Sequence, residues 1–147
     1  MKSSSLPTIL IADDDEDDRN WVKDALTESP VPSNLRFVTD GEELMDFLRH
    51  RGRYAAPRDL SYPGLIILDL NMPRKDGREA LKEIRADPRL RHIPVVILTT
   101  SQAESDVFYT YNIGANTFIQ KPVTLESLSE IMRALTRYWF EIAKLPL

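Results

Sequence analysis

Five short apolar runs punctuate this chain, and segments with a different spacing of apolar residues lie between them. The runs are rich in Ile, Val, Leu or Phe, and most of them do not alternate with polar residues. This is the pattern of strands that are buried on both faces of a parallel sheet. We therefore expect a strand at each run. The runs cover residues 8–12, 35–39, 64–70, 93–99 and 116–119.

The segments between the runs place apolar residues three or four positions apart, which is the spacing of one face of an amphipathic helix. Residues 105–113 show this spacing only weakly, and the last helix is expected to run from Leu125 to about Ala143. The clear faces are Trp21, Val22, Ala25 and Leu26 in the first segment, Leu44, Phe47 and Leu48 in the second, Ala80, Leu81 and Ile84 in the third, and Leu128, Ile131, Leu135, Trp139 and Ile142 in the last.

Strand and helix thus alternate along the whole chain, which predicts an α/β fold of the (βα)5 type. Since crossovers between parallel strands are right-handed, we expect an open, doubly wound sheet of the flavodoxin-like kind, with strand order 2-1-3-4-5. The length of 147 residues suits one domain. We expect its core at about residues 7–137, with residues 138–147 extending the last helix and forming a tail.

Composition excludes several classes of protein. The chain has no cysteine, so a disulfide framework, a thiolate nucleophile and the usual Cys-rich zinc sites are excluded. No stretch has the length of a signal peptide or of a membrane span. The net charge is −4, and we interpret the cluster of Arg49, Arg51 and Arg53 as a solvated face rather than a nucleic-acid surface. We expect a cytoplasmic protein that binds neither nucleic acid nor membrane.

Polar side chains follow the predicted strands at the edge where open α/β sheets bind their ligands. The first strand leads into Asp13 and Asp14, and the third leads into Asp69. The fourth strand ends in Thr99, and Lys121 follows the fifth. We therefore expect three carboxylates, a hydroxyl and an ammonium group to converge at one site.

Three neighbouring carboxylates need a counter-charge, because each disfavours ionisation of the others. Mg²⁺ prefers oxygen ligands and keeps several waters, so two or three Asp oxygens and one backbone carbonyl would leave room for a phosphate. Such a site suits phosphoryl transfer, in which positioning and neutralisation of charge dominate. Asp69 is the candidate carboxylate nucleophile, while Thr99 and Lys121 are candidates for holding phosphate oxygens.

The six consecutive acids from Asp13 to Asp18 divide into two groups. We assign Asp13 and Asp14 to the metal. The remaining four acids are expected at the entry and first turn of a helix, where the helix dipole favours negative side chains by about 0.3 to 1 kcal/mol each.

Four motifs at these positions resemble the receiver (CheY-like) domain of two-component response regulators, and the resemblance covers nearly the whole chain. The motifs are IADDD, ILDLNMPRKDG, VVILTTS and FIQKP. The spacings are typical of that family: 55 residues from Asp14 to Asp69, 30 from there to Thr99, and 22 from there to Lys121.

The resemblance implies a role for each residue of the site. Asp69 would accept a phosphoryl group from the phosphohistidine of a sensor kinase. The chain would then be no enzyme beyond catalysing its own phosphorylation and dephosphorylation. The implied Mg²⁺ ligands are Asp13, Asp14, Asp69 and the backbone carbonyl of Asn71.

Further roles follow from the same resemblance. Thr99 would turn inward to bind the phosphoryl group, Lys121 would contact it, and Phe118 stands where the family has its switching aromatic residue, although Tyr is more frequent there. The Lys121–Pro122 peptide bond would be cis. The residues expected to influence the lifetime of the acyl phosphate are Asn71, Thr100 and Ser101.

Several segments are similar to single-domain response regulators that serve phytochrome-type histidine kinases. They are NMPRKDG, DPRLRHIPVVILTTS, RALTRYWFEIAKLP and the long loop of residues 52–63. This part of the resemblance implies a phytochrome-type kinase as partner. With no output domain expected after the last helix, output would be a protein contact or onward transfer of phosphate.

Two other functions stay open on the sequence alone. Tyr138, Trp139 and Phe140 suggest a surface for a partner or for a homodimer, so the domain is alternatively a dimeric interaction module whose assembly phosphorylation tunes. An aspartyl-phosphate hydrolase is the other alternative. It is disfavoured because Asn71 stands where those enzymes carry a second Asp as general acid.

Overall fold

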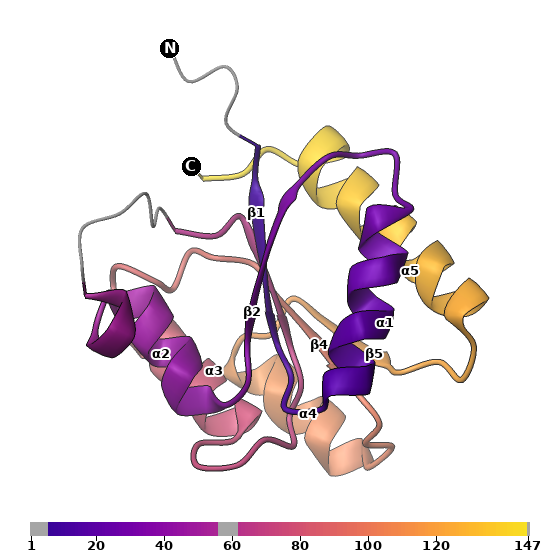
Figure 1. Ribbon diagram of the computed structural model, residues 1–147. Helices are drawn as coiled ribbons and strands as arrows, with labels where there is room; N and C mark the ends of the chain where they lie inside the picture. Colours follow the sequence, from indigo (N-terminus) through magenta and orange to yellow (C-terminus); the bar gives the residue numbers. More distant parts are fainter. Residues whose placement is uncertain (1–5, 56–61, 147) are drawn as a thin grey trace.

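A five-stranded parallel sheet with helices on both faces forms the protein (Figure 1). The coordinates are a computed structural model, which describes residues 6–55 and 62–146. The strand order is β2-β1-β3-β4-β5, so the predicted flavodoxin-like α/β fold is confirmed. The strands are β1 (Thr8–Ala12), β2 (Asn34–Val38), β3 (Leu65–Leu68), β4 (Val95–Thr99) and β5 (Thr117–Gln120).

Each strand sends alternate side chains to opposite faces of the sheet, and this alternation builds two cores. Ile9 and Ile11 of β1 pack with α1 and α5 on one face, whereas Leu10 and Ala12 pack with α2 and α3 on the other. In Figure 1, α1 and α5 accordingly lie together on one side of the sheet, and α2 and α3 lie on the other. The helices are α1 (Glu16–Thr27), α2 (Gly41–Arg49), α3 (Gly77–Ala86), α4 (Glu104–Ile113) and α5 (Leu125–Arg137), and a short 3₁₀ turn spans Gly52–Tyr54.

Side-chain caps explain where most of the helices begin. Asp15, Asp40, Asp76 and Thr124 each accept a hydrogen bond from a backbone N–H three residues further on, which satisfies one of the free donors of the first turn. The α4 helix has no side-chain cap, and only Thr110 within it is fully buried. This agrees with the weak helical pattern of its sequence.

The C-terminal segment departs from the predicted continuous helix. After α5 the chain forms one π-helical turn, Tyr138–Ile142, in which the Ala143 N–H donates to the Tyr138 carbonyl at 2.7 Å. The wider turn changes the angle between successive side chains. As a result Phe140 packs against the core with Trp139, whereas Ile142 is 62% exposed, so the prediction that Ile142 continues the core face is wrong.

Two further details bear on the predicted surfaces. Trp21 is 39% exposed although its spacing predicted a core position, because it lies at the rim of the α1 face. Of the arginine cluster, Arg51 and Arg53 are exposed, and Arg49 is held between Glu83 and Asp87. Residues 56–61 of the predicted long loop lie outside the described residues. None of the helices described is both long and apolar enough to cross a bilayer.

Candidate functional site

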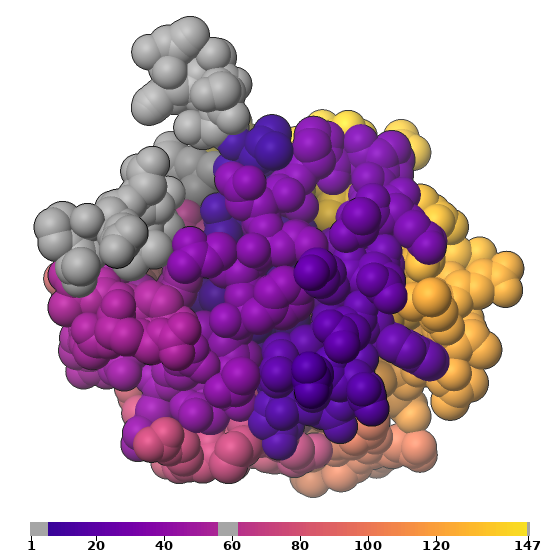
Figure 2. Space-filling view, viewed as in Figure 1, coloured from indigo at the N-terminus to yellow at the C-terminus, as the bar shows by residue number. Residues whose placement is uncertain are grey.

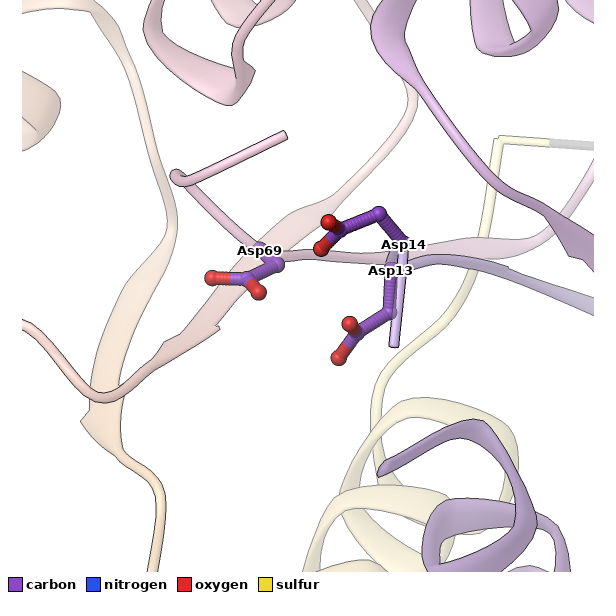
Figure 3. Close-up of side chains that lie close together, drawn as sticks. All are labelled: Asp13, Asp14 and Asp69. Carbon is purple, nitrogen blue, oxygen red and sulfur yellow. The ribbon is translucent and has the colours of Figure 1, made fainter. Parts of the chain in front are cut away.

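Asp13, Asp14 and Asp69 lie together at the carboxyl ends of β1 and β3 (Figure 3). The strands are neighbours in parallel register, with Ala12 opposite Leu68, and the Asp69 N–H donates to the Ala12 carbonyl at 3.0 Å. One carboxylate oxygen from each residue lies within 4.8 Å of the others. Asp13 and Asp69 are buried, while Asp14 is exposed, so the cluster opens to solvent on one side.

The loops that follow several strands meet at this end of the molecule. In the space-filling view, the indigo segment after β1, the pink segment after β3 and the orange segment after β4 share the lower part of the visible surface (Figure 2). The structure therefore brings the carboxyl ends of these strands to one edge, as the sequence predicts.

The ammonium group of Lys121 supplies the positive charge inside the cluster. Its Nζ donates to Asp13 at 2.8 Å, to Asp69 at 3.2 Å and to Asp18 at 2.7 Å. Burial alone lowers the pKa of Lys121, but the hydrogen bonds to Asp13 and Asp18 outweigh burial and raise it well above its usual range. Lys121 is thus a fixed cation in the folded protein.

Sequence reasoning missed Asp18, which it assigned only to the first turn of a helix. The residue does lie in the first turn of α1, where its N–H donates to the capping Asp15 carboxylate at 3.1 Å. Its side chain also reaches across to Lys121. The only signal for Asp18 in the sequence was its position, five residues after Asp13 and more than one helical turn beyond the strand end.

The donor set of the acidic cluster fits a hard divalent cation. Burial raises the pKa of Asp13, although hydrogen bonds from Lys121 and from the Asp15 N–H oppose that rise. Ionisation of Asp13 is costly next to the carboxylates of Asp69 and Asp14. A cation that prefers oxygen ligands would therefore stabilise the ionised form. Asp13, Asp14 and Asp69 offer such oxygens, and the Asn71 carbonyl remains a predicted fourth ligand.

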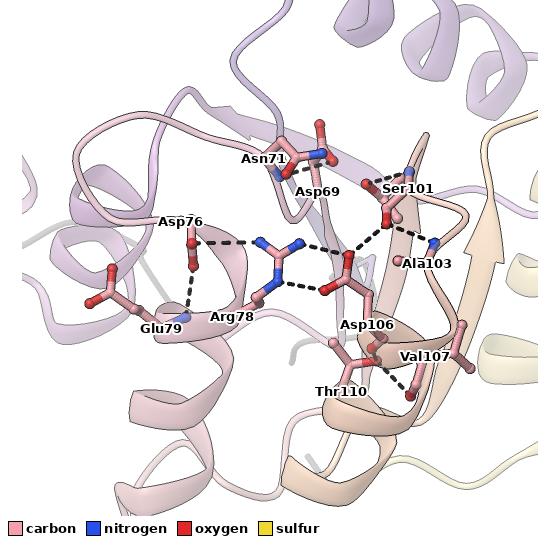
Figure 4. A network of polar contacts seen from close by, with 11 residues as sticks. Asp69, Asn71, Asp76, Arg78, Glu79, Ser101, Ala103, Asp106, Val107 and Thr110 are labelled. Atoms are coloured by element: carbon pink, nitrogen blue, oxygen red, sulfur yellow. Dashed lines mark hydrogen bonds and ion pairs between the residues drawn. The ribbon is translucent and has the colours of Figure 1, made fainter.

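A polar network joins the end of β4 to the starts of α3 and α4 (Figure 4). Thr99 is fully buried, and its Oγ1 accepts the Ser101 N–H at 3.4 Å. The Ser101 hydroxyl donates to Asp106 at 2.6 Å, and the same carboxylate receives two hydrogen bonds from Arg78, both of 2.8 Å. Hydrogen bonds from Arg78 and Ser101 lower the pKa of Asp106.

Thr99 makes its side-chain hydrogen bond within this network and not with Asp69. Between the described positions, no hydrogen bond joins Thr99 to Asp69, and the inward turn of Thr99 toward a phosphoryl group stays a prediction. Thr100 is exposed and Ser101 is half-buried. Arg78 and Asp106 were not predicted as part of the site, since their pairing links two separate helices and leaves no local pattern in the sequence.

The remaining predicted residues lie around the site. Phe118 on β5 is half-buried against the α2–α3 core, and its N–H donates to the Tyr111 hydroxyl at 3.1 Å. The Lys121–Pro122 peptide bond is trans, so the predicted cis bond is wrong for this structure. The trans isomer is the favoured one before proline by about 0.5 to 1 kcal/mol.

A small pocket opens between α1 and the segment after β5, beside Lys121. Its volume is about 150 Å³. The exposed side chains of Trp21 and Val123 contribute to its lining together with Asp18 and Thr100. The pocket therefore offers an apolar surface directly next to the charged cluster.

Residues 9–133 match the response regulator receiver domain family. The chain belongs to this family. Response regulator Rcp1 of Synechocystis sp. is 39% identical over 149 residues, which is 99% of this chain and 99% of that protein. Receiver domains signal in two-component systems through phosphorylation, so the site lies in a signalling protein.

Solved structures of receiver proteins superpose closely on this chain. The phosphorylated cyanobacterial phytochrome response regulator RcpA has a TM-score of 0.90 and 41% identity, covering 97% of this chain and 100% of that one. Response regulator RPA3017, from red light signalling of R. palustris, has a TM-score of 0.89 and 37% identity, with 97% and 99% covered. The Mn²⁺-bound form of Rcp1 has a TM-score of 0.86 and 38% identity, with 96% and 99% covered.

Proposed function

We propose that this receiver domain accepts a phosphoryl group on Asp69 from the phosphohistidine of a sensor histidine kinase. The observation that carries the proposal is the placement of the Asp69 carboxylate. It lies at the end of β3, within reach of two other carboxylates and 3.2 Å from the Lys121 ammonium group.

The transfer would be a simple displacement at phosphorus. An Asp69 oxygen attacks phosphorus, the bond from phosphorus to the kinase imidazole nitrogen breaks, and that nitrogen keeps the electron pair. Asp13, Asp14, Asp69 and the Asn71 carbonyl would hold Mg²⁺, which supplies positive charge next to the transferred oxygens. Lys121 supplies a further positive charge next to the Asp69 carboxylate.

Signalling would use the new hydrogen bonds that Thr99 and Lys121 can make with a phosphoryl group. Moving an equilibrium from 1:99 to 99:1 takes about 5.5 kcal/mol of differential binding. Hydrogen bonds from Thr99 and Lys121 to a charged phosphoryl group, at about 1.5 to 3 kcal/mol each, supply most of that amount. Thr99 would exchange its present partner, the Ser101 N–H, for a phosphoryl oxygen, and Phe118 would follow.

Asn71, Thr100 and Ser101 would influence the lifetime of the acyl phosphate. Asn71 is exposed, and its N–H donates to Asp69 at 3.4 Å. The chain would catalyse only this phosphorylation and the later loss of phosphate. The phosphohistidine of the kinase is made from ATP, so we place the exchange in the cytoplasm.

The kinase we propose is of the phytochrome type. RcpA is a phytochrome response regulator and RPA3017 acts in red light signalling, and both match this chain over nearly its full length. The apolar pocket beside Lys121, with Trp21 and Val123 at its rim, is the surface we propose for the kinase.

Phosphotransfer kinetics test the partner. A phytochrome-type kinase core, previously labelled on its histidine, is expected to transfer phosphate to the wild-type chain faster than an unrelated sensor kinase core does. The Asp69→Asn variant is expected to accept none from either. Equal rates from both cores would contradict the phytochrome assignment while leaving Asp69 as the acceptor.

Self-association is a second proposal, which the exposed C-terminal turn favours. Tyr138 is 50% exposed and stacks edge-on against Trp139 with ring centroids 5.1 Å apart, whereas Phe140 packs inward. Of the three predicted interface residues, Tyr138 is therefore the most exposed, while Trp139 and Phe140 are half-buried. Sedimentation with and without a phosphoryl mimic tests this. A mass that is unaffected both by the mimic and by truncation after Arg137 would contradict it.

A further inference from the structure

Asp18 contacts the phosphorylation site without belonging to its acidic cluster. Its Oδ2 accepts a hydrogen bond from Lys121 Nζ at 2.7 Å, the shortest of the three bonds that this ammonium group donates. The group of carboxylates close enough to share a cation consists of Asp13, Asp14 and Asp69, and does not include Asp18. Asp18 therefore contacts the Lys121 ammonium group but does not belong to the acidic cluster.

We propose that Asp18 is a positioning residue, which holds the Lys121 ammonium group in place while Asp13 and Asp69 bind a divalent cation. The inference rests on the proposed function of the site. It assigns a task to a residue that neither the metal nor the phosphoryl group touches.

The partners of the ammonium group explain why such a residue is needed. An ammonium group has three N–H donors, and here each has one carboxylate partner. A divalent cation on Asp13 and Asp69 would draw the charge of these carboxylates toward itself and would repel the lysine. Asp18 would then be the one partner of the three that does not also hold the cation.

The start of α1 positions the backbone of Asp18 for this bond. The Asp18 N–H donates to the capping Asp15 carboxylate, which anchors the residue in the first helical turn. The Lys121 side chain is only 10% exposed, so its ammonium group has little access to water as a replacement partner. Without Asp18 the metal-bound site would contain a poorly compensated, nearly buried cation.

Asp17 provides a control of matched charge. It lies in the same first turn of α1 and is exposed, and in residues 6–55 and 62–146 it forms no ion pair. The Asp17→Asn substitution removes the same formal charge from the same turn but leaves the Lys121 contacts intact. Any difference between the two variants therefore measures the bond to Lys121 and not the general field of the acids.

Mg²⁺ titration of the full chain, without phosphodonor, tests the proposal. Asp18→Asn is expected to weaken Mg²⁺ binding about tenfold, because loss of the bond costs the metal-bound state more than the metal-free state. Asp17→Asn is expected to weaken it about twofold or less, as an exposed charge does. Asp18→Glu, which keeps a carboxylate, should recover most of the affinity. Equal weakening in Asp18→Asn and Asp17→Asn would overturn the proposal.

The NMR signal of the Lys121 ammonium group gives a second readout, which does not depend on affinity. At saturating Mg²⁺ the signal is expected to persist in the wild type and in Asp17→Asn, and to broaden beyond detection in Asp18→Asn. An unchanged signal in Asp18→Asn would overturn the proposal. Neither readout involves phosphate, so failure of Asp69 to become phosphorylated would be seen separately. A circular dichroism spectrum of each variant verifies that it is folded.

Discussion

The ammonium group of Lys121 lies 3.2 Å from a carboxylate oxygen of Asp69, although the two residues are 52 positions apart in the sequence. The parallel sheet produces this contact, since β3 and β5 flank β4 and their following residues emerge at the same edge. The carboxylate that we propose as nucleophile and its counter-charge are thereby held together.

Lys121→Gln is expected to destabilise the protein in the absence of divalent cations. It leaves Asp13 and Asp69 buried without a counter-ion, which costs about 3 kcal/mol when a buried pair is broken. Mg²⁺ should restore much of this loss, because it binds the same carboxylates. Urea unfolding with and without Mg²⁺ measures both effects.

Lys82→Gln on the exposed side of α3 is the control for loss of a lysine and should change little. If Lys121→Gln is as stable as the wild type without metal, the ammonium group is not the counter-ion of the cluster.

Gly77→Ala is expected to displace the backbone of Asp69, the proposed phosphoacceptor. A Cβ at Gly77 would collide with the backbone carbonyl oxygen of Asp69 and would lie 2.8 Å from the Leu70 Cα. Both contacts are with backbone, which cannot turn away as a side chain can, so we expect a loss of about 1 to 3 kcal/mol. The rate of phosphorylation at Asp69 should fall as well.

Gly64→Ala is the matched control, since it precedes the same strand at the opposite end of the sheet. Its Cβ would first meet a flexible side-chain atom, Leu145 Cδ1 at 3.2 Å. Thermal unfolding together with phosphorylation rates separates the two variants. Equal phosphorylation rates in both would show that the Asp69 backbone tolerates the added methyl group.

Asp106→Asn tests the network at the start of α4 through its pH dependence. Hydrogen bonds from Arg78 and Ser101 lower the pKa of Asp106 in the folded state. Its stabilising contribution is therefore complete above about 3.9, the ordinary pKa of an unfolded Asp, and is lost as pH falls through the lower folded-state value.

At pH 7 we expect Asp106→Asn to be less stable than the wild type by about 1 kcal/mol, a value that allows for solvent screening at this half-buried pair. The difference should shrink as pH falls below about 3.9. Urea unfolding across this range measures it. A stability difference that does not change with pH would mean that the charge of Asp106 does not stabilise the network.

Much of the fold and of the site was predictable because it depends on local patterns. Each predicted apolar run overlaps a strand, and the strand ends carry Asp13, Asp69 and Lys121 to one edge as expected. The doubly wound sheet followed from the handedness of crossovers, and five strands with a terminal helix suggested the strand order.

The features that were missed depend on contacts between distant segments. Asp18 carried the signal of an ordinary first-turn acid, and its bond to Lys121 arises only when α1 packs beside the end of β5. The pairing of Arg78 with Asp106 likewise depends on the packing of α3 against α4. Ile142 was misplaced because the periodicity of an α-helix does not foresee a π-helical turn.

The central claim is that Asp69 is the phosphoacceptor, and intact-mass spectrometry tests it most directly. The wild-type chain is incubated with a small-molecule phosphodonor and Mg²⁺, next to Asp69→Asn and next to the exposed Asp17→Asn as control. We expect the wild type and Asp17→Asn to gain the mass of one phosphoryl group and Asp69→Asn to gain none. An undiminished yield of phosphorylated Asp69→Asn would contradict the account.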